Sequence, residues 1–211
     1  MKNKINGLIM FVGGLALIFL MIIPQYKITT SEPQNIYEMN ADEIVKGTHI
    51  TGEIDFIYDY YASESRETKT LGITTSTEND TGRWYIFPVY GPTEADTRLL
   101  TLRVSPKSYA TVDQIVEETC AYLEGTSNEF GRTTYSIDAR AVKLDSELHQ
   151  LYYDWYGTEV SKEEADSYLV PYVLVPVMEV KHIVIVGVLT IIMTIAGLIM
   201  LLKRPAREEL Y

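Results

Sequence analysis

The chain has 211 residues, with 18 Lys and Arg against 29 Asp and Glu and a formal net charge of −11 at pH 7. Nucleic-acid binding needs a basic footprint that neutralises phosphates, so this composition argues against a nucleic-acid partner. The single cysteine, Cys120, excludes an internal disulfide and favours a bacterial cell envelope over a disulfide-rich secreted setting.

Two apolar runs without charged residues, 5–26 and 183–202, lie at opposite ends of the chain. A helix of roughly 20 residues crosses the ~30 Å hydrocarbon layer of a bilayer, so both runs are long enough to span it. They predict a two-pass membrane protein whose first partner is the lipid bilayer. The alternative for the first run is a cleaved signal peptide. Residues 20–26 contain no pair of small residues for cleavage, which favours a retained anchor.

The flanking cations predict the orientation. The two tails carry Lys2, Lys4, Lys203, Arg204 and Arg207, and the positive-inside bias then places both termini in the cytoplasm. The segment 24–181 holds the other 13 Lys and Arg against 27 Asp and Glu, a formal charge of −14. The predicted parts are the tail and first membrane helix (1–27), a stalk (28–40), an extracytoplasmic domain (41–180), the second membrane helix (181–202) and a cytoplasmic tail (203–211).

The first half of the domain shows a short helix followed by strands. Asn40 with Glu43 forms a capping pattern, and Gly47 ends the helix. Residues 48–60 alternate with a period of two, which is typical of a half-buried strand. Residues 62–82 are rich in Ser, Thr, Glu and Asn, and predict a long exposed hairpin loop.

Two further strands continue the pattern. Residues 84–90 are apolar on both faces and predict a central strand with Pro88 at a bulge or an edge. A turn leads to a strand at 98–104. Together with 48–60, these strands predict an antiparallel meander.

The second half alternates helices with extended segments. Thr111 with Gln114 predicts a capped helix that ends at Gly125, and a strand follows at 134–144. Leu148, Leu151, Tyr152 and Trp155 form the apolar stripe of a second helix, which ends at Gly157. Ser161 with Glu164 caps a third, short helix, and 168–180 leads, extended, into the second membrane helix.

This order predicts an α+β fold: an antiparallel sheet or partly open small barrel with two to three packed helices, flanked by two transmembrane helices. The segments 50–54, 84–89 and 122–125, with the flanking membrane helices, resemble an uncharacterised family of bacterial two-pass membrane proteins with a small extracytoplasmic domain. The resemblance covers nearly the whole chain and implies no site, substrate or cofactor.

No catalytic, cofactor or metal site emerges from the residue patterns. His49, His149 and His182 are scattered and match no metal-ligand spacing, and no Gly-x-Ser-x-Gly elbow is present. Tyrosine is the enriched aromatic, with 16 residues. Its ring and hydroxyl suit partly solvent-exposed binding surfaces as well as the small hydrophobic core of a small domain. The candidate binding surface consists of Tyr60, Tyr61, Tyr153 and Tyr156, with core packing as the alternative.

Small residues in the second membrane run form a candidate packing face. Gly187, Thr190, Thr194 and Gly197 repeat at a spacing of three and four, and such stripes let helices approach closely in lipid. The simplest partner is the first helix, which carries Gly7 and Gly14, and a homo-oligomer or another membrane protein is the alternative.

The functional hypothesis is a membrane-anchored, non-enzymatic envelope protein. Its acidic extracytoplasmic domain mediates protein–protein interaction or assembly. The alternative is a ligand- or sugar-binding sensor domain that uses the tyrosine-rich surface, and the third possibility is a membrane-tethered hydrolase. A concave pocket with converging polar groups would favour the last two, and a flat apolar patch would favour the first.

Overall fold

The computed structural model describes residues 2–70, 73–91, 96–129, 131–157 and 160–203. They belong to two compact units: a helical unit (Met1–Ser31 with Met178–Tyr211) and a sheet domain (Glu32–Val177). Arg204 and Arg207, used in the orientation prediction, lie outside the described residues, as does most of the predicted cytoplasmic tail.

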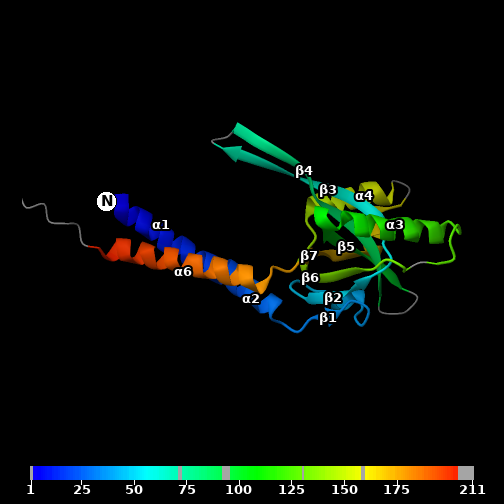
Figure 1. Ribbon diagram of the computed structural model, residues 1–211, viewed down its shortest axis with the longest axis horizontal. Coiled ribbons are helices and arrows are strands. Elements are labelled where there is room, and N and C mark those ends of the chain that lie inside the picture. The colour runs from blue at the N-terminus through cyan, green and yellow to red at the C-terminus, as the bar shows by residue number, and fades with distance from the viewer. Residues whose placement is uncertain (1, 71–72, 92–95, 130, 158–159, 204–211) are drawn as a thin grey trace, which may run out of the picture. The chain divides into compact units, whose positions relative to one another are not determined.

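The helical unit contains two helices long and apolar enough to cross a membrane. The first consists of α1 (Lys2–Leu17), a π-helical turn (Ile18–Ile22) and α2 (Ile23–Thr29), and the second is α6 (Val180–Leu202) (Figure 1). The π-helical turn ends two residues before Pro24, which lies in the first turn of α2. Proline lacks the N–H that a continuous α-helix would need there, so the hydrogen-bond pattern changes at this point.

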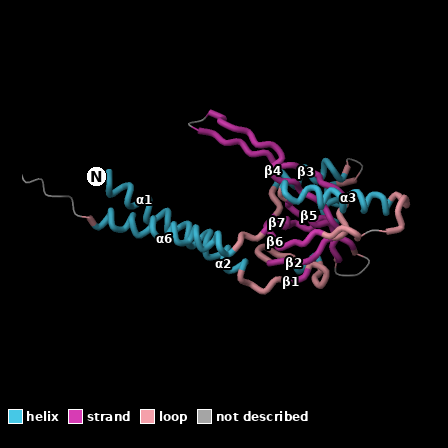
Figure 2. Tube along the Cα trace, in the orientation of Figure 1, coloured by secondary structure: helices cyan, strands magenta, loops and turns pink. Residues whose placement is uncertain are grey.

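The sheet domain is built on a seven-stranded mixed sheet with the order β1-β2-β6-β7-β5-β4-β3 (Figure 2). The pairs β1–β2 and β5–β7 are parallel and the other pairs are antiparallel. The strands are β1 (Gln34–Asn35), β2 (His49–Ile54), β3 (Asp59–Thr70), β4 (Ile73–Tyr90), β5 (Thr97–Val104), β6 (Tyr135–Lys143) and β7 (Leu169–Pro176). The α+β class is thus confirmed, whereas the purely antiparallel sheet and the small barrel are wrong.

Helices cover both faces of the sheet. On one face, α3 (Tyr109–Leu123) contributes Val112 and Ile115 to the main core. On the other, α4 (Ser146–Tyr156) and α5 (Lys162–Tyr168) form a second core around the fully buried Tyr152. Because successive strand residues face opposite sides, Tyr85 lies in the first core and Ile86 in the second.

The largest departure from the predicted topology is β7, at the position where the sequence predicts an extended connection. It pairs with β5 and β6 in the interior of the sheet, and Val173 and Leu174 are buried on opposite faces. Pro171 falls where the β5–β7 register is irregular, so the missing proline N–H interrupts no regular ladder.

Residues 62–70 and 73–82 form strands rather than a loop, which corrects the prediction for the described part of 62–82. They continue β3 and β4 into a two-stranded ribbon that projects from the rest of the sheet (Figure 1). The pairing of β4 with β5 stops at Arg83 and Val104, and beyond this point the described residues of β4 pair with β3 alone. At its other end β4 extends past β3, and Pro88 lies in this edge segment, as predicted.

Local signals set most helix ends. Asn40 and Glu43 form the predicted capping box around the 3₁₀ turn Ala41–Glu43, and the Ser161 hydroxyl accepts a hydrogen bond from the Glu164 N–H at 3.2 Å. The predicted capping box at Thr111 is wrong, because α3 already begins at Tyr109, after a 3₁₀ turn at Pro106–Ser108. Gly125 follows the end of α3 with φ +70°, a conformation that glycine adopts without strain.

Candidate functional site

The sheet domain contains two neighbouring cavities with volumes of about 340 and 320 Å³. They share two lining residues, Tyr58 and Thr97, so we describe them as two lobes of one aromatic cleft. The aromatic lining of the first lobe is Tyr37, Phe56, Tyr58, Phe87 and Tyr90, and that of the second is Tyr58, Trp155, Tyr156 and Tyr168. Each lobe is in the size range of small-molecule sites.

The connection 55–58 creates the first lobe. It carries the chain from β2 to β3, which lie far apart in the strand order, and it brings Phe56 and Tyr58 beside the end of β4. Ile57 anchors the connection because its side chain is buried and its N–H donates to the Thr119 hydroxyl of α3 at 3.3 Å. The Tyr58 N–H donates to the Ile86 carbonyl at 2.9 Å. The rings of Phe56 and Tyr58 pack at 85° with centroids 5.3 Å apart.

Asp55 gives the first lobe a carboxylate. The Tyr37 hydroxyl donates to Asp55 Oδ1 at 3.1 Å, and the Tyr37 N–H donates to the Asn35 side chain at 3.1 Å. Partial burial and the adjacent Asp55 charge raise the pKa of Tyr37 to about 12. Tyr37 is therefore a neutral hydrogen-bond donor at physiological pH and orients the carboxylate.

The second lobe lies between β5 and the α4–α5 pair. Tyr156 of α4 stacks on Tyr168 of α5 with an interplanar angle of 18° and a centroid separation of 6.4 Å. Trp155 packs beside Tyr156 at 6.4 Å. Leu99 of β5 completes the lining, so this lobe is almost entirely apolar and suits flat or aliphatic groups.

Three of the four predicted binding tyrosines, Tyr61, Tyr153 and Tyr156, pack around the buried Tyr152 in the second core, whereas Tyr60 lies elsewhere. Tyr156 lines the aromatic cleft, whereas Tyr60 packs on the Tyr85 ring with centroids 5.7 Å apart. The Tyr61 hydroxyl lies 3.3 Å from Thr101 Oγ1, and burial raises the pKa of Tyr61 to about 12. The Tyr153 hydroxyl donates to Asp166 Oδ1 at 2.5 Å.

Sequence reasoning missed most of the cleft. Its remaining aromatic residues come from separate segments: Tyr37 follows β1, Tyr90 ends β4 and Tyr168 ends α5. The only signal along the chain is the density of tyrosine, which does not indicate which rings meet.

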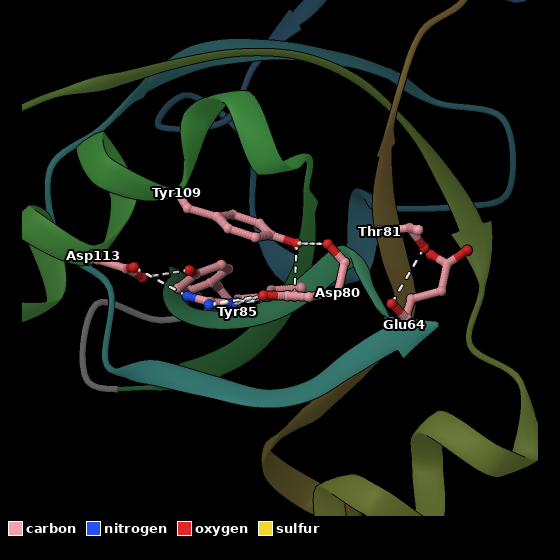
Figure 3. A network of polar contacts seen from close by, with 7 residues as sticks. Glu64, Asp80, Thr81, Tyr85, Tyr109 and Asp113 are labelled. Carbon is pink, nitrogen blue, oxygen red and sulfur yellow. Dashed lines mark hydrogen bonds and ion pairs between the residues drawn. The ribbon is translucent and has the colours of Figure 1, made fainter. Parts of the chain in front are cut away.

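A polar network joins the base of the ribbon to α3 (Figure 3). Arg83 donates to Asp80 Oδ2 at 2.9 Å and to Asp113 Oδ2 at 3.0 Å. Its guanidinium lies 4.2 Å from the Tyr109 ring centroid and 4.8 Å from that of Tyr60. The Tyr109 hydroxyl donates to Asp80 Oδ1 at 2.9 Å, and the Tyr85 hydroxyl to Asp113 Oδ1 at 2.5 Å. Because these side chains satisfy one another's hydrogen bonds, we interpret the network as one that holds the base of the ribbon in place and not as a reactive site.

The electrostatics of Asp80 agree with this structural role. The Arg83 hydrogen bond lowers the pKa of Asp80 below its ordinary value of 3.8. Its backbone has φ +58°, in the left-handed region that aspartate tolerates better than most residues. Because the folded-state pKa is lowered, the contribution of Asp80 to stability is present above pH 3.8 and is lost as the pH falls through the folded value.

The candidate transmembrane packing residues lie on one buried stripe of α6. Gly187, Thr190, Thr194 and Gly197 are all buried within the helical unit. A Cβ atom on Gly197 would lie 2.7 Å from the Phe11 nitrogen and 2.8 Å from the Gly7 carbonyl oxygen, both backbone atoms of α1. Gly187 has more room, because a Cβ atom on Gly187 would lie 3.6 Å from Ile22 Cγ2 of the π-helical turn. The close approach is therefore at Gly197.

Among the described residues, no group of three or more His, Cys, Asp and Glu side chains could hold a metal ion. Residues 1–203 match the family described as a domain of unknown function (DUF8577), and the chain belongs to this family. No curated protein and no solved structure shows a significant match.

Proposed function

We propose that this member of the DUF8577 family is a membrane-anchored, non-enzymatic binding protein whose aromatic cleft takes a small ligand with an apolar body. The observation that carries the proposal is the cleft itself: two adjoining lobes lined mainly by aromatic rings, with Asp55 and tyrosine hydroxyls as polar groups. A concave, mostly apolar site with a few converging polar groups is the usual form of a small-molecule site.

The test uses p-cresol, a neutral aromatic probe, and the full chain in lipid nanodiscs. We expect saturation-transfer NMR to show saturable binding that empty nanodiscs lack. Tyr58→Ala should weaken it at least tenfold, because Tyr58 lines both lobes. Tyr122→Ala removes an exposed ring on α3 outside the cleft and serves as the matched control. Equal binding by the two variants, or no saturable binding, would overturn the proposal.

We further propose that the sheet domain is outside the cell membrane and that both termini are cytoplasmic. The support is the distribution of cations, with Lys2 and Lys4 before the first helix and Lys203 directly after the second. The acidic charge of the domain is compatible with export, because long segments cross largely regardless of their charge.

A second candidate function is association with another copy of the chain through the ribbon. Among the described residues, the ribbon beyond Arg83 pairs with no other strand, and an isolated two-stranded ribbon is only marginally stable in water. Strand addition is a common way to pair such edges.

One set of thiol variants tests both the orientation and the ribbon contact. Cys120, the sole cysteine, is exposed on α3, and Thr77 is exposed on the ribbon. We expect a membrane-impermeant maleimide to label Cys120 in intact cells and to leave a cysteine added after Lys203 unlabelled until lysis. With Thr77→Cys and Cys120→Ser combined, a bis-maleimide with a spacer of about 15–20 Å should link two copies, because three strand spacings of about 4.8 Å would separate the two β4 positions when two β3 strands pair. The reverse labelling pattern would invert the orientation, and absence of linkage would exclude the ribbon pairing.

A further inference from the structure

The aromatic cleft contains an acidic side chain, Asp55, in its lining. Among the described lining residues of both lobes there is no Lys, Arg or His, and Asp55 is the one carboxylate. The tyrosine hydroxyls add no compensating charge. A ligand anion would therefore meet an unfavourable field, whereas a cation would meet a favourable one.

The aromatic lining adds to the same preference. The faces of aromatic rings are electrically negative, and a cation within about 6 Å of a ring centroid is attracted by the ring. Five aromatic side chains border the lobe that contains Asp55. The segment 24–181 has a formal charge of −14, which raises the local concentration of cations around the domain.

We infer that the ligand of the aromatic cleft is a small organic cation with apolar substituents, of the alkylammonium class. This inference rests on the proposed function and specifies its ligand. The Asp55 carboxylate with its Tyr37 partner would face the charged centre, and the rings would contact its alkyl groups. A metal ion would find one carboxylate where it needs several oxygen ligands. A sugar would find few partners for its hydroxyls, because most of the lining is apolar.

The test compares two molecules of nearly equal shape that differ in charge. Choline and 3,3-dimethyl-1-butanol would each compete with p-cresol for the full chain in nanodiscs, measured by saturation-transfer NMR. We expect choline to compete at a concentration at least tenfold lower than the alcohol. Raising the salt concentration should weaken the binding of choline and leave the binding of the alcohol unchanged, because salt screens the attraction of choline to the acidic domain.

Two isosteric variants separate the local charge from the total charge. Asp55→Asn keeps an oxygen that can accept the Tyr37 hydrogen bond and should remove most of the advantage of choline over the alcohol. Asp59→Asn lowers the domain charge equally at a residue outside both lobes and should retain that advantage. Thermal unfolding of each variant checks that it is folded.

The outcomes distinguish this inference from the proposed function. If p-cresol binds but choline competes no better than the alcohol, the cation inference is wrong and the apolar site stands. If Asp59→Asn reduces choline binding as much as Asp55→Asn does, attraction is a property of the whole surface and the inference is again overturned. If the unmodified chain does not bind p-cresol, both the proposed function and the cation inference are wrong. Competition by glucose in place of choline would assign the cleft to sugars.

Discussion

Replacing Tyr152 by alanine is expected to lower the free energy of unfolding of the sheet domain by about 3–5 kcal/mol. The side chain is fully buried, with 0% exposure, and its ring lies within 6.3 Å of the rings of Tyr61, Trp155 and Tyr156. Removing it leaves a cavity between α4 and the sheet. Guanidinium unfolding of the full chain, followed by the fluorescence of Trp84 and Trp155, measures the loss.

Two matched variants identify the cause of the stability loss expected for Tyr152→Ala. Tyr152→Phe keeps the ring and removes only the hydroxyl, which donates to the Ala165 carbonyl at 3.3 Å, so we expect a loss of about 1 kcal/mol. Tyr122→Ala removes an exposed tyrosine, and its effect should be within about 0.5 kcal/mol. A loss below about 1 kcal/mol for Tyr152→Ala would mean that the second core does not stabilise the domain.

Replacing Gly197 by leucine should separate α6 from α1. Its Cβ alone would meet two backbone atoms of α1 at 2.7 and 2.8 Å, and backbone cannot move aside as the end of a flexible side chain can. A disulfide between cysteines at positions 14 and 194, in a Cys120→Ser background, reports the contact. The Cβ of residue 14 would lie 3.1 Å from Thr194 Cβ, which is close enough for a disulfide after a small adjustment.

We expect Gly197→Leu to abolish this disulfide and Gly187→Ala to retain it, because a Cβ at Gly187 meets only ordinary contact at 3.6 Å. The electrophoretic mobility of the disulfide-linked product distinguishes packing within one chain from packing between copies. A disulfide that forms equally well in both variants would show that the stripe does not control the approach of the helices.

Features that depend on neighbouring residues could be predicted from the sequence. The apolar runs indicate helices of membrane-spanning length because insertion depends on the composition of about 20 consecutive residues. The cap at Ser161 and the helix end at Gly157 follow because each signal acts within one turn. The capping box predicted at Thr111 fails because Pro106 starts a turn further upstream.

Only the tertiary structure decided the sheet order and the aromatic cleft. Whether 168–180 is a linker or an interior strand depends on whether β5 and β6 leave a space between them, and no pattern within that segment records this. The aromatic cleft likewise exists because the connection 55–58 joins strands separated by four others, which brings Tyr58 beside Tyr90 and Tyr168. Such proximity comes from burial shared by residues distant in the chain, so long-range packing rather than local propensity determines both the interior strand β7 and the site.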